Sequence, residues 1–263
     1  MQIQSTINNI RQIVKSKPMT APSFRTTATD GCKVHTNMPV KYKSGKAILS
    51  SIYVEETLGY EPTIFTKIKN FLGKTMGEYH YTINPKTKTI NKGYIETDPK
   101  YRNKGVGEIM RLSSIMELKE NHISAIELDA LPEAIQFHSK YKFEPNLKKK
   151  ESTVAILESI SELPKLDKES KTKAKELIAQ IHHNKPPYTE ELNTNDEKAV
   201  NGFMTEYIET HKNNWQDANF HQLLPMKLTS ERVQKTPISS INYSKNTALI
   251  MWCDCKGTKI LGH

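Results

Sequence analysis

The chain is most informative between positions 94 and 107, where it reads Tyr94-Ile95-Glu96-Thr97-Asp98-Pro99-Lys100-Tyr101-Arg102-Asn103-Lys104-Gly105-Val106-Gly107. The start of this stretch is typical of a strand, its middle of a short turn, and its end of a helix that continues to about residue 121. The helix has a broad apolar face, formed by Val106, Ile109, Met110, Leu112, Ile115, Met116 and Leu118. A glycine-bearing turn that feeds a helix exposes unpaired backbone N–H groups at the positive end of the helix dipole. The stretch therefore predicts an anion site suited to a pyrophosphate.

Four residues of this turn strengthen the expectation. Gly105 and Gly107 have no side chains, so phosphate oxygens can approach the backbone closely. Arg102 and Lys104 add positive charge at the same place. The turn is not a Walker loop, which needs Gly-x-x-x-x-Gly-Lys-Ser/Thr, and it lacks the third glycine of a dinucleotide fingerprint.

The segment after this helix predicts another strand and another helix. A short strand is expected at Ala125 to Leu128, and a helix is expected from Pro132 to about Tyr141, with Ile135 and Phe137 turned inward. Proline suits the first turn of a helix. Strand, helix, strand and helix in this order predict a mainly parallel pairing between the strand at 90–97 and the strand at 125–128.

The segment before residue 94 has mostly strand signals. Strands are expected around Val34 to Tyr42 and over 47–54, 76–83 and 90–97. Between the last two, Asn84-Pro85-Lys86-Thr87 is turn chemistry and predicts an antiparallel hairpin. The span from Ile64 to Leu72 places Ile64, Ile68 and Leu72 at helical spacing, so we interpret it as a short helix or an irregular loop.

The pattern changes after the charge run at 148–150, which we interpret as a solvated loop. Apolar stripes predict two helices over 167–183 and 196–212 that form an αα unit, and a final strand is expected at Ala248 to Cys253. We therefore expect three parts: a flexible N-terminal arm (1–30), a main domain (31–160), and a helical C-terminal extension ending in a strand (161–263).

Composition narrows the classes of protein. The 263 residues carry a formal charge of +9, with 36% hydrophobic and 25% charged residues, which predicts a folded chain. The positive residues are mostly lysines, because arginine occurs only at Arg11, Arg25, Arg102, Arg111 and Arg232. A nucleic-acid footprint more often clusters arginine with aromatic residues, so nucleic acid is not the expected partner, although the charge permits it.

Cysteines and hydropathy indicate the compartment. The three cysteines are too few and too unevenly placed for a disulfide framework, which favours a reducing compartment. Residues 1–17 lack the apolar core of a secretion signal, and no stretch approaches the roughly eighteen apolar residues of a membrane span. We expect a cytoplasmic monomer or homodimer without a membrane partner. Cys253-Asp254-Cys255 with His263 is a weak zinc pattern, because zinc sites usually need two spaced pairs, so no metal is expected.

Residues 94–143 as a whole resemble the GNAT acetyltransferase superfamily. The turn resembles the family's acyl-CoA loop, Gln/Arg-x-x-Gly-x-Gly/Ala, with its Pro-x-Tyr-Arg lead-in present at Pro99 to Arg102. The second half resembles the family pattern Ala-Ile-x-x-Tyr-x-x-x-Gly-Phe, because it reads Ala134-Ile135-Gln136-Phe137-His138-Ser139-Lys140-Tyr141-Lys142-Phe143.

The resemblance implies an α+β fold, with a GNAT-like central mixed β-sheet flanked by helices and a helical C-terminal appendage. It implies an enzyme that transfers an acetyl group directly from acetyl-CoA to a primary amine of an unknown acceptor in a ternary complex. Backbone groups of Ile95 and Thr97 would hold the acetyl and pantetheine arm. The implied cofactor-binding residues are Ile95, Glu96, Thr97, Arg102, Asn103, Lys104, Gly105, Val106, Gly107 and Phe137.

The residue expected to protonate the CoA thiolate differs from the one that the family usually carries. His138 occupies the position where many members carry a tyrosine, and it is either the acid or a partly buried packing residue. Tyr141, one helical turn on, is the alternative acid. Lys142 replaces the usual glycine, and in a left-handed conformation it would cost on the order of 1 kcal/mol unless the helix ends differently.

The base that takes up the amine proton is less well indicated. Strand alternation places Asn91, Gly93, Ile95 and Thr97 on one face and Glu96 on the other. In the family the carboxylate often lies on the face shared with Asn91, which argues against Glu96. Glu78 and Asp129 are the fallback candidates.

Two alternative functions stay open. One is a catalytically inactive GNAT-like scaffold that binds CoA or a protein partner, which the missing tyrosine favours. The other is an acetyltransferase that acts on aminoacyl-tRNA, which the positive charge permits and the scarcity of arginine opposes.

Overall fold

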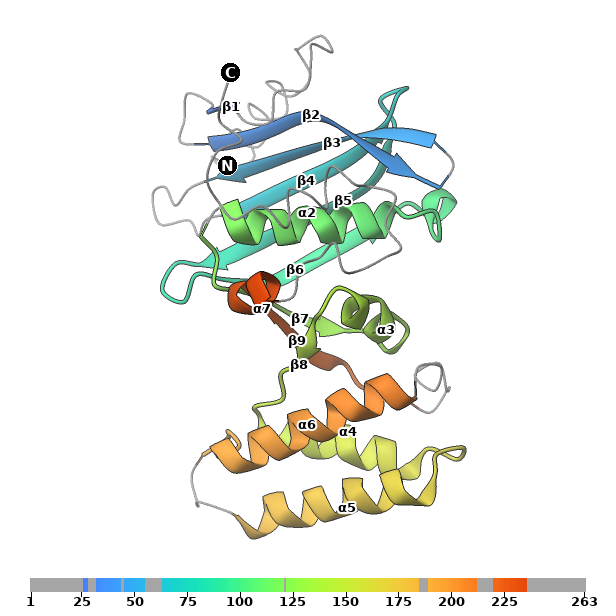
Figure 1. Ribbon diagram of the computed structural model, residues 1–263, viewed down its shortest axis with the longest axis vertical. Helices are drawn as coiled ribbons and strands as arrows, with labels where there is room; N and C mark the ends of the chain where they lie inside the picture. Colours follow the sequence, from blue (N-terminus) through green and yellow to red (C-terminus); the bar gives the residue numbers. More distant parts are fainter. Residues whose placement is uncertain are drawn as a thin grey trace, which may run out of the picture. The chain divides into compact units, whose positions relative to one another are not determined.

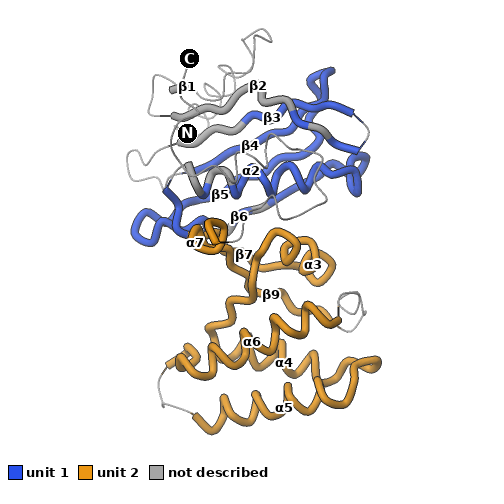
Figure 2. Tube along the Cα trace, in the orientation of Figure 1, with its two compact units in different colours: residues 1–124, 237–263 blue, residues 125–236 orange. Residues whose placement is uncertain are grey.

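The computed structural model describes residues 26–27, 32–43, 45–54, 63–120, 122–184, 189–211 and 220–235. It divides the chain into two units, one of Met1–Ser124 with Pro237–His263 and one of Ala125–Thr236 (Figure 2). Most of the expected N-terminal arm, the expected strand at 248–253 and the cysteines at 253 and 255 lie outside the described residues.

An antiparallel sheet forms the first unit, in which each strand pairs with the next along the chain (Figure 1). The turn at 84–87 connects β5 to β6, with Ile83 opposite Ile90, so the expected hairpin is confirmed. The expected strands at 47–54, 76–83 and 90–97 are also confirmed. The strands are β1 (Thr26–Thr27), β2 (Cys32–Tyr42), β3 (Gly45–Val54), β4 (Thr63–Asn70), β5 (Thr75–Asn84) and β6 (Thr89–Thr97).

Strand β4 corrects the interpretation of residues 64–72 as a helix or an irregular loop. Ile64, Thr66 and Ile68 are all buried, while the residues between them are half-buried, which is the alternation of a strand. Residues four apart lie on one face in a helix and in a strand alike. The threonine between the two isoleucines hid the apolar alternation of a strand. The two isoleucines, four residues apart, then matched the spacing of a helix.

A short 3-10 helix, η1 (Pro99–Tyr101), and the long helix α2 (Val106–Glu120) follow β6. Helix α2 packs on the sheet, with contacts to β2, β4, β5 and β6 (Figure 1). Its first turn approaches β5 at Gly77, where an added Cβ would lie 2.9 Å from a Val106 methyl and 3.1 Å from the Met110 methyl. The expected helix is therefore confirmed, and a glycine in the neighbouring strand allows its close packing.

The second unit combines a small antiparallel sheet with helices. Strand β9 (Leu224–Thr229) pairs with β7 (Ala125–Ala130) and with β8 (Glu144–Pro145). The expected strand and helix after residue 124 are confirmed as β7 and α3 (Pro132–Lys140). The parallel pairing expected between β6 and β7 joins different units and stays a prediction. The remaining helices are α4 (Lys150–Glu162), α5 (Lys168–His183), α6 (Thr194–Thr210) and α7 (Ser230–Lys235).

The expected αα unit is confirmed as α5 and α6, which contact each other, and α4 joins them by packing on α5. The solvated loop expected at 148–150 is correct only for Lys148 and Lys149, because Lys150 already begins α4. A buried carboxylate fixes the connection between α5 and α6: Asp196 accepts hydrogen bonds from the side-chain amides of Gln180 (2.6 Å), Asn184 (3.0 Å) and Asn193 (2.7 Å).

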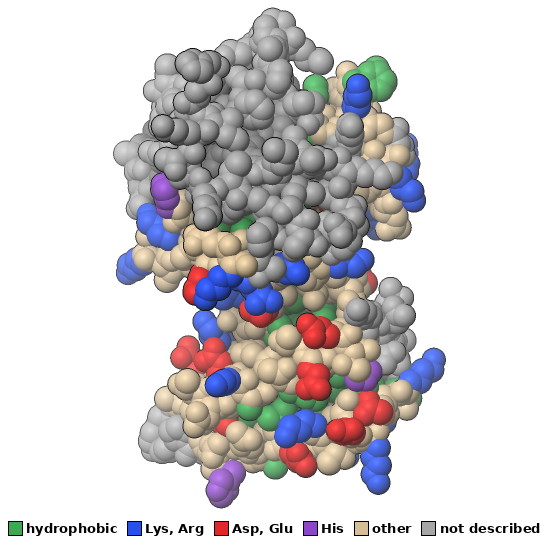
Figure 3. Space-filling view, viewed as in Figure 1, with side chains coloured by type: hydrophobic (Ala, Val, Ile, Leu, Met, Phe, Trp, Pro, Cys, Tyr) green, Lys and Arg blue, Asp and Glu red, His purple; other side chains and the backbone are tan. Residues whose placement is uncertain are grey.

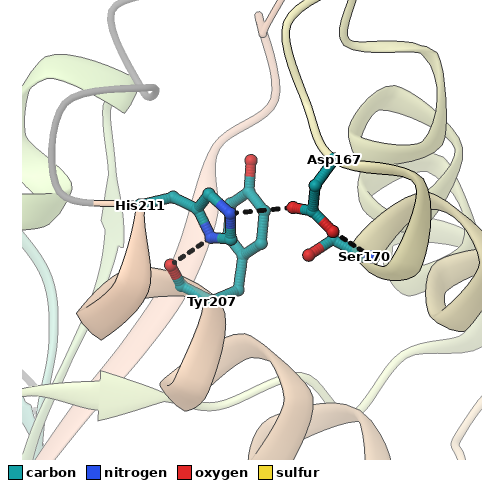
Figure 4. A network of polar contacts seen from close by, with 4 residues as sticks. All are labelled: Asp167, Ser170, Tyr207 and His211. Atoms are coloured by element: carbon teal, nitrogen blue, oxygen red, sulfur yellow. Dashed lines mark hydrogen bonds and ion pairs between the residues drawn. The ribbon is translucent and has the colours of Figure 1, made fainter.

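A second polar network connects the other ends of these helices (Figure 4). Asp167 caps the start of α5 by accepting the backbone N–H of Ser170 at 2.8 Å, and its other oxygen lies 3.0 Å from Nε2 of His211. The Nδ1 atom of His211 lies 3.3 Å from the backbone oxygen of Tyr207, whose ring stacks on the imidazole at 4.5 Å. Both ring nitrogens of His211 lie close to oxygen atoms. The contact between Asp167 and His211 therefore connects α5 to the end of α6, and His211 is not available as a base for a substrate.

The expected α+β class is confirmed, with a sheet covered by helices and a helical part after it. The three-part division at residues 30 and 160 stays a prediction.

Candidate functional site

The turn between β6 and α2 has the backbone shape that its glycine suggested. Asp98 accepts the backbone N–H of Lys100 at 2.9 Å and begins η1, and Arg102 then returns to an extended conformation. Asn103 has a φ of 57° and Gly105 a φ of 88°, both in the left-handed region. A Cβ added at Gly105 would meet no atom within 4 Å, so the turn opens to solvent there.

Five successive backbone amides at this turn lack an acceptor among the described residues. Within the part of the chain that the structure describes, the N–H groups from Asn103 to Gly107 donate to no backbone or side-chain oxygen. Further along, Ile109 donates its backbone N–H to the Gly105 oxygen at 3.2 Å, as in a regular helix. The N-terminus of a 15-residue helix adds its partial positive charge, and the exposed Arg102 lies in the same turn. Such an arrangement has the features that suit an anion with several oxygens, such as a diphosphate.

Tyr101 holds the turn in place through contacts on several sides. Its hydroxyl accepts Nδ2 of Asn70 at 3.4 Å, and its ring packs edge-on against Tyr42 at 6.3 Å. The Lys104 ammonium lies 5.6 Å from the centre of the same ring. The backbone N–H of Lys43 also donates to the Lys104 oxygen at 2.7 Å, which joins the β2–β3 turn to the β6–α2 turn. In the sequence, Tyr101 was noted only as the tyrosine of the Pro-x-Tyr-Arg lead-in, without a role of its own.

Strand β6 contains a β-bulge that the sequence did not reveal. The register pairs His80 with Tyr94 and Thr82 with Asn91, so Tyr81 alone stands opposite two residues, Lys92 and Gly93. The ring of Tyr81 occupies the space beside Gly93, because a Cβ added there would lie 1.4 Å from a ring carbon. A glycine inside a strand was the available signal for this bulge.

The bulge corrects the predicted faces of β6. Tyr79 faces α2, since its hydroxyl lies 3.0 Å from the Ser113 hydroxyl, and its partner Ile95 lies on that face too. Ile90 also faces α2, because it pairs with the buried Ile83, so the adjacent Asn91 faces away. Asn91 and Ile95 therefore lie on opposite faces, and the predicted common face is wrong. The extra residue in the bulge reverses the alternation, so that Glu96 shares the face of Asn91.

The backbone groups of Ile95 and Thr97 have the direction that an extended ligand beside β6 requires. Asp98 donates its backbone N–H to the Met76 oxygen at 3.0 Å, which fixes the alternation of hydrogen-bonded pairs along β5 and β6. Thr97 and Ile95 then occupy the non-hydrogen-bonded positions. Their N–H and C=O groups point to the edge of β6 that faces away from β5.

The two candidate acids lie in the second unit and belong to an aromatic cluster on α3. His138 is 9% exposed and Tyr141 is 3% exposed. The ring of Phe137 lies 5.3 Å from that of His138 and 5.1 Å from that of Tyr141, and Phe143 lies 5.7 Å from His138. Both candidates therefore have packing roles, and their assignment as acids stays a prediction.

Helix α3 ends with Lys142 in the left-handed conformation that the sequence suggested. Its φ is 69°, and its N–H donates to the Ser139 oxygen at 3.0 Å. The next N–H, from Phe143, donates to the His138 oxygen at 3.3 Å. This is a Schellman motif, which most often places glycine at the position of Lys142.

The candidate bases differ in their surroundings. Glu78 forms an ion pair with Lys67 at 2.7 Å on the face of the sheet away from α2. Glu96 stands opposite Glu78 in the register and is exposed. Asp129 is also exposed, and it lies on β7 in the second unit. Among the described residues, no group of three or more His, Cys, Asp and Glu side chains is arranged to hold a metal ion, and no helix could cross a membrane.

Comparisons with known proteins give structural likenesses, among them the following two. No family model matches the sequence, and neither does a curated protein. A chimera of the spermidine N-acetyltransferase SpeG from Vibrio cholerae and hSSAT is 13% identical, with a TM-score of 0.29, and the match covers 33% of this chain and 56% of the chimera. Nourseothricin acetyltransferase is 16% identical, with a TM-score of 0.30, over 50% of this chain and 88% of that protein. Both are acetyltransferases by name, but TM-scores near these values are too low to transfer an activity.

Proposed function

We propose that the chain is a GNAT-type N-acetyltransferase that uses acetyl-CoA and acts on a primary amine. The observation that carries this proposal is the row of amides from Asn103 to Gly107, which lack acceptors among the described residues at the start of α2. A diphosphate supplies oxygens to such a row and is attracted by the helix dipole. Arg102 and Lys104 would add charge-assisted contacts to the phosphates.

The acetyl arm would extend from this turn along β6. The outward-facing backbone groups of Ile95 and Thr97 supply hydrogen bonds to the amides of pantetheine and to the thioester oxygen. The acceptor nitrogen attacks the thioester carbon, the carbon–sulfur bond breaks, and the sulfur leaves as a thiolate. His138 or Tyr141 is the proposed donor of the proton that the thiolate takes up.

Glu96 is the proposed base, acting directly or through water. The bulge in β6 removes the objection to this residue, because Glu96 lies on the same face as Asn91. Glu96→Gln should lower kcat at least about 100-fold, remove the acidic limb of the pH–rate profile, and leave CoA binding unchanged. Glu78→Gln is the matched control on the same face, and a larger loss in that variant would assign the base to Glu78.

The cofactor site is tested by calorimetric titration with CoA and by thermal unfolding. CoA at about 100 times its dissociation constant should stabilise the protein by about 2.7 kcal/mol. Gly105→Glu should abolish binding, because its carboxylate meets the phosphates. Gly73→Glu is a close control, since Gly73 has a φ of 80° and an equally open Cβ position in the β4–β5 turn. Equal effects of the two substitutions would refute the site.

A CoA-binding scaffold without turnover is the second candidate, and the burial of His138 and Tyr141 favours it. The two functions differ in the release of free CoA from acetyl-CoA in the presence of a panel of amines. Binding that Gly105→Glu abolishes, without any thiol release, would favour the scaffold.

A further inference from the structure

Two adjacent apolar residues are unusually exposed at the turn between β4 and β5. Phe71 is 74% exposed and Leu72 is 77% exposed, the largest values among the big apolar side chains that the structure describes. The turn does not depend on their side chains, because backbone N–H groups hold it: Oδ1 of Asn70 accepts those of Leu72 at 3.0 Å and of Lys74 at 2.9 Å. Their exposure therefore needs an explanation other than folding.

Three turns meet at this end of the sheet in the first unit (Figure 1). The β2–β3 turn is joined to the β6–α2 turn by the hydrogen bond from Lys43 to the Lys104 oxygen, at 2.7 Å. The β4–β5 turn is joined to it by Asn70, which donates to the Tyr101 hydroxyl at 3.4 Å. The apolar pair thus stands at the rim of one continuous surface.

That surface is strongly basic. Asp98 is the only carboxylate in the sequence of these three turns, and it already accepts the backbone N–H of Lys100. None of the cations forms an ion pair within the described parts of the chain. Figure 3 shows hydrophobic and Lys or Arg side chains exposed side by side at the upper right of the molecule. The cations are Lys43, Lys46, Lys69, Lys74, Lys100 and Arg102.

We propose that this end of the sheet docks on an anionic phospholipid surface. The side chains of Phe71 and Leu72 enter the boundary between headgroups and acyl chains, and the surrounding cations face the phosphates. Apolar insertion and electrostatic attraction are the two contributions that hold peripheral proteins on membranes. The sequence expectation of no membrane partner rested on the lack of a spanning segment, which a peripheral contact does not need.

The chemistry of the apolar pair favours a lipid surface over RNA. A base stacks on an aromatic ring, and Phe71 could supply one, but Leu72 has no aromatic face and cannot read a base edge. The basic set contains a single arginine, whereas base recognition relies heavily on arginine. The exposure of both side chains, 74% for Phe71 and 77% for Leu72, leaves them accessible to a bilayer.

Co-sedimentation with phospholipid vesicles tests the proposal with the full chain. Vesicles of phosphatidylcholine containing roughly one quarter phosphatidylglycerol should bind the protein, and phosphatidylcholine alone should bind it at least about tenfold more weakly. Raising the salt from about 0.1 M to about 1 M should reduce binding to the anionic vesicles. The double substitution Phe71→Ser with Leu72→Ser should reduce it about tenfold or more.

A matched control uses two other exposed leucines. Leu131 is 52% exposed and Leu223 is 49% exposed, both in the second unit, and their double substitution to serine should leave vesicle binding unchanged. Circular dichroism and CoA titration check that each variant is folded, and these measurements are independent of the vesicle assay. Equal binding of the wild type and the Phe71–Leu72 variant would overturn the proposal. So would salt-sensitive binding to RNA without binding to anionic vesicles.

Discussion

Replacing Gly93 by alanine should disrupt the bulge in β6. The added Cβ would lie 1.4 Å from one carbon of the Tyr81 ring and 1.6 Å from another, whereas ordinary contacts begin at 3.4 Å. The ring must therefore move by roughly 2 Å. It is confined, because its centre lies 4.8 Å from that of Tyr79 and its hydroxyl accepts Nη1 of Arg111 at 3.4 Å.

The free energy of unfolding should fall by about 3 kcal/mol in Gly93→Ala, at the upper end of the usual cost of overpacking. Tyr81→Ala should lower it by about 3–5 kcal/mol, because a buried aromatic ring is lost. In the double variant the clash is absent, and alanine is favoured over glycine in a strand by roughly 0.5 kcal/mol. The two substitutions should therefore be non-additive by about 3 kcal/mol.

Urea unfolding followed by circular dichroism measures these free energies, and hydrogen exchange of the β5 and β6 peptides assigns them to the first unit. Gly202→Ala is the control, since Gly202 lies on α6 with nothing within 4 Å of its Cβ position, and it should be stabilising by about 0.8–1 kcal/mol. Additivity of Gly93→Ala and Tyr81→Ala within about 0.5 kcal/mol would refute the packing described for the bulge.

Three further predictions concern the second unit. Lys142→Gly should raise the free energy of unfolding by about 0.5–1 kcal/mol, measured in urea, because glycine relieves the left-handed strain but gains entropy in the unfolded chain; a decrease would contradict this. Asp196→Ala should lower the same quantity by about 3 kcal/mol, because three side-chain amides lose a buried acceptor, and a loss below about 1 kcal/mol would argue against that cluster. The Ser170 backbone N–H holds the pKa of Asp167 at about 2, below its ordinary 3.8, so the carboxylate stabilises the fold above that ordinary value and loses its effect as the pH falls toward 2. The difference in urea midpoint between the wild type and Asp167→Asn should accordingly shrink over that interval, and a constant difference would exclude the carboxylate as its cause.

Much of the fold could be predicted because the apolar residues of its helices and strands recur at regular intervals. Helix α2 has an apolar stripe and a glycine turn before it, and the β5–β6 hairpin has turn residues between two alternating segments. Strand β4 could not be distinguished, because a buried threonine interrupts its apolar face. Helix α4 was not predicted, and the charge of Lys150 at its start suggested a solvated loop instead.

The turn before α2 could be predicted from its glycine and the helix that follows, whereas the face on which Glu96 lies could not, because the strand register decides it. Glycines and cations before a helix predict an anion site without knowledge of the tertiary structure, and that site stays a prediction. The face of Glu96 depends instead on the bulge, which exists because the Tyr81 ring fills the place of a side chain at Gly93. A ring contact across two strands leaves no mark in the sequence except the glycine itself.

Helix α2 has no solvent-facing side in its middle: every residue from Ile109 to Ile115 is at most 2% exposed, Arg111, Ser113 and Ser114 included. Amides in such a segment exchange with deuterium only when much of the surrounding structure opens. The backbone nitrogens of residues 103–107 thus precede a rigid segment. The donors for an anion would be in place before the anion binds. Little ordering entropy would then oppose binding, and association should be fast and free of a slow conformational phase.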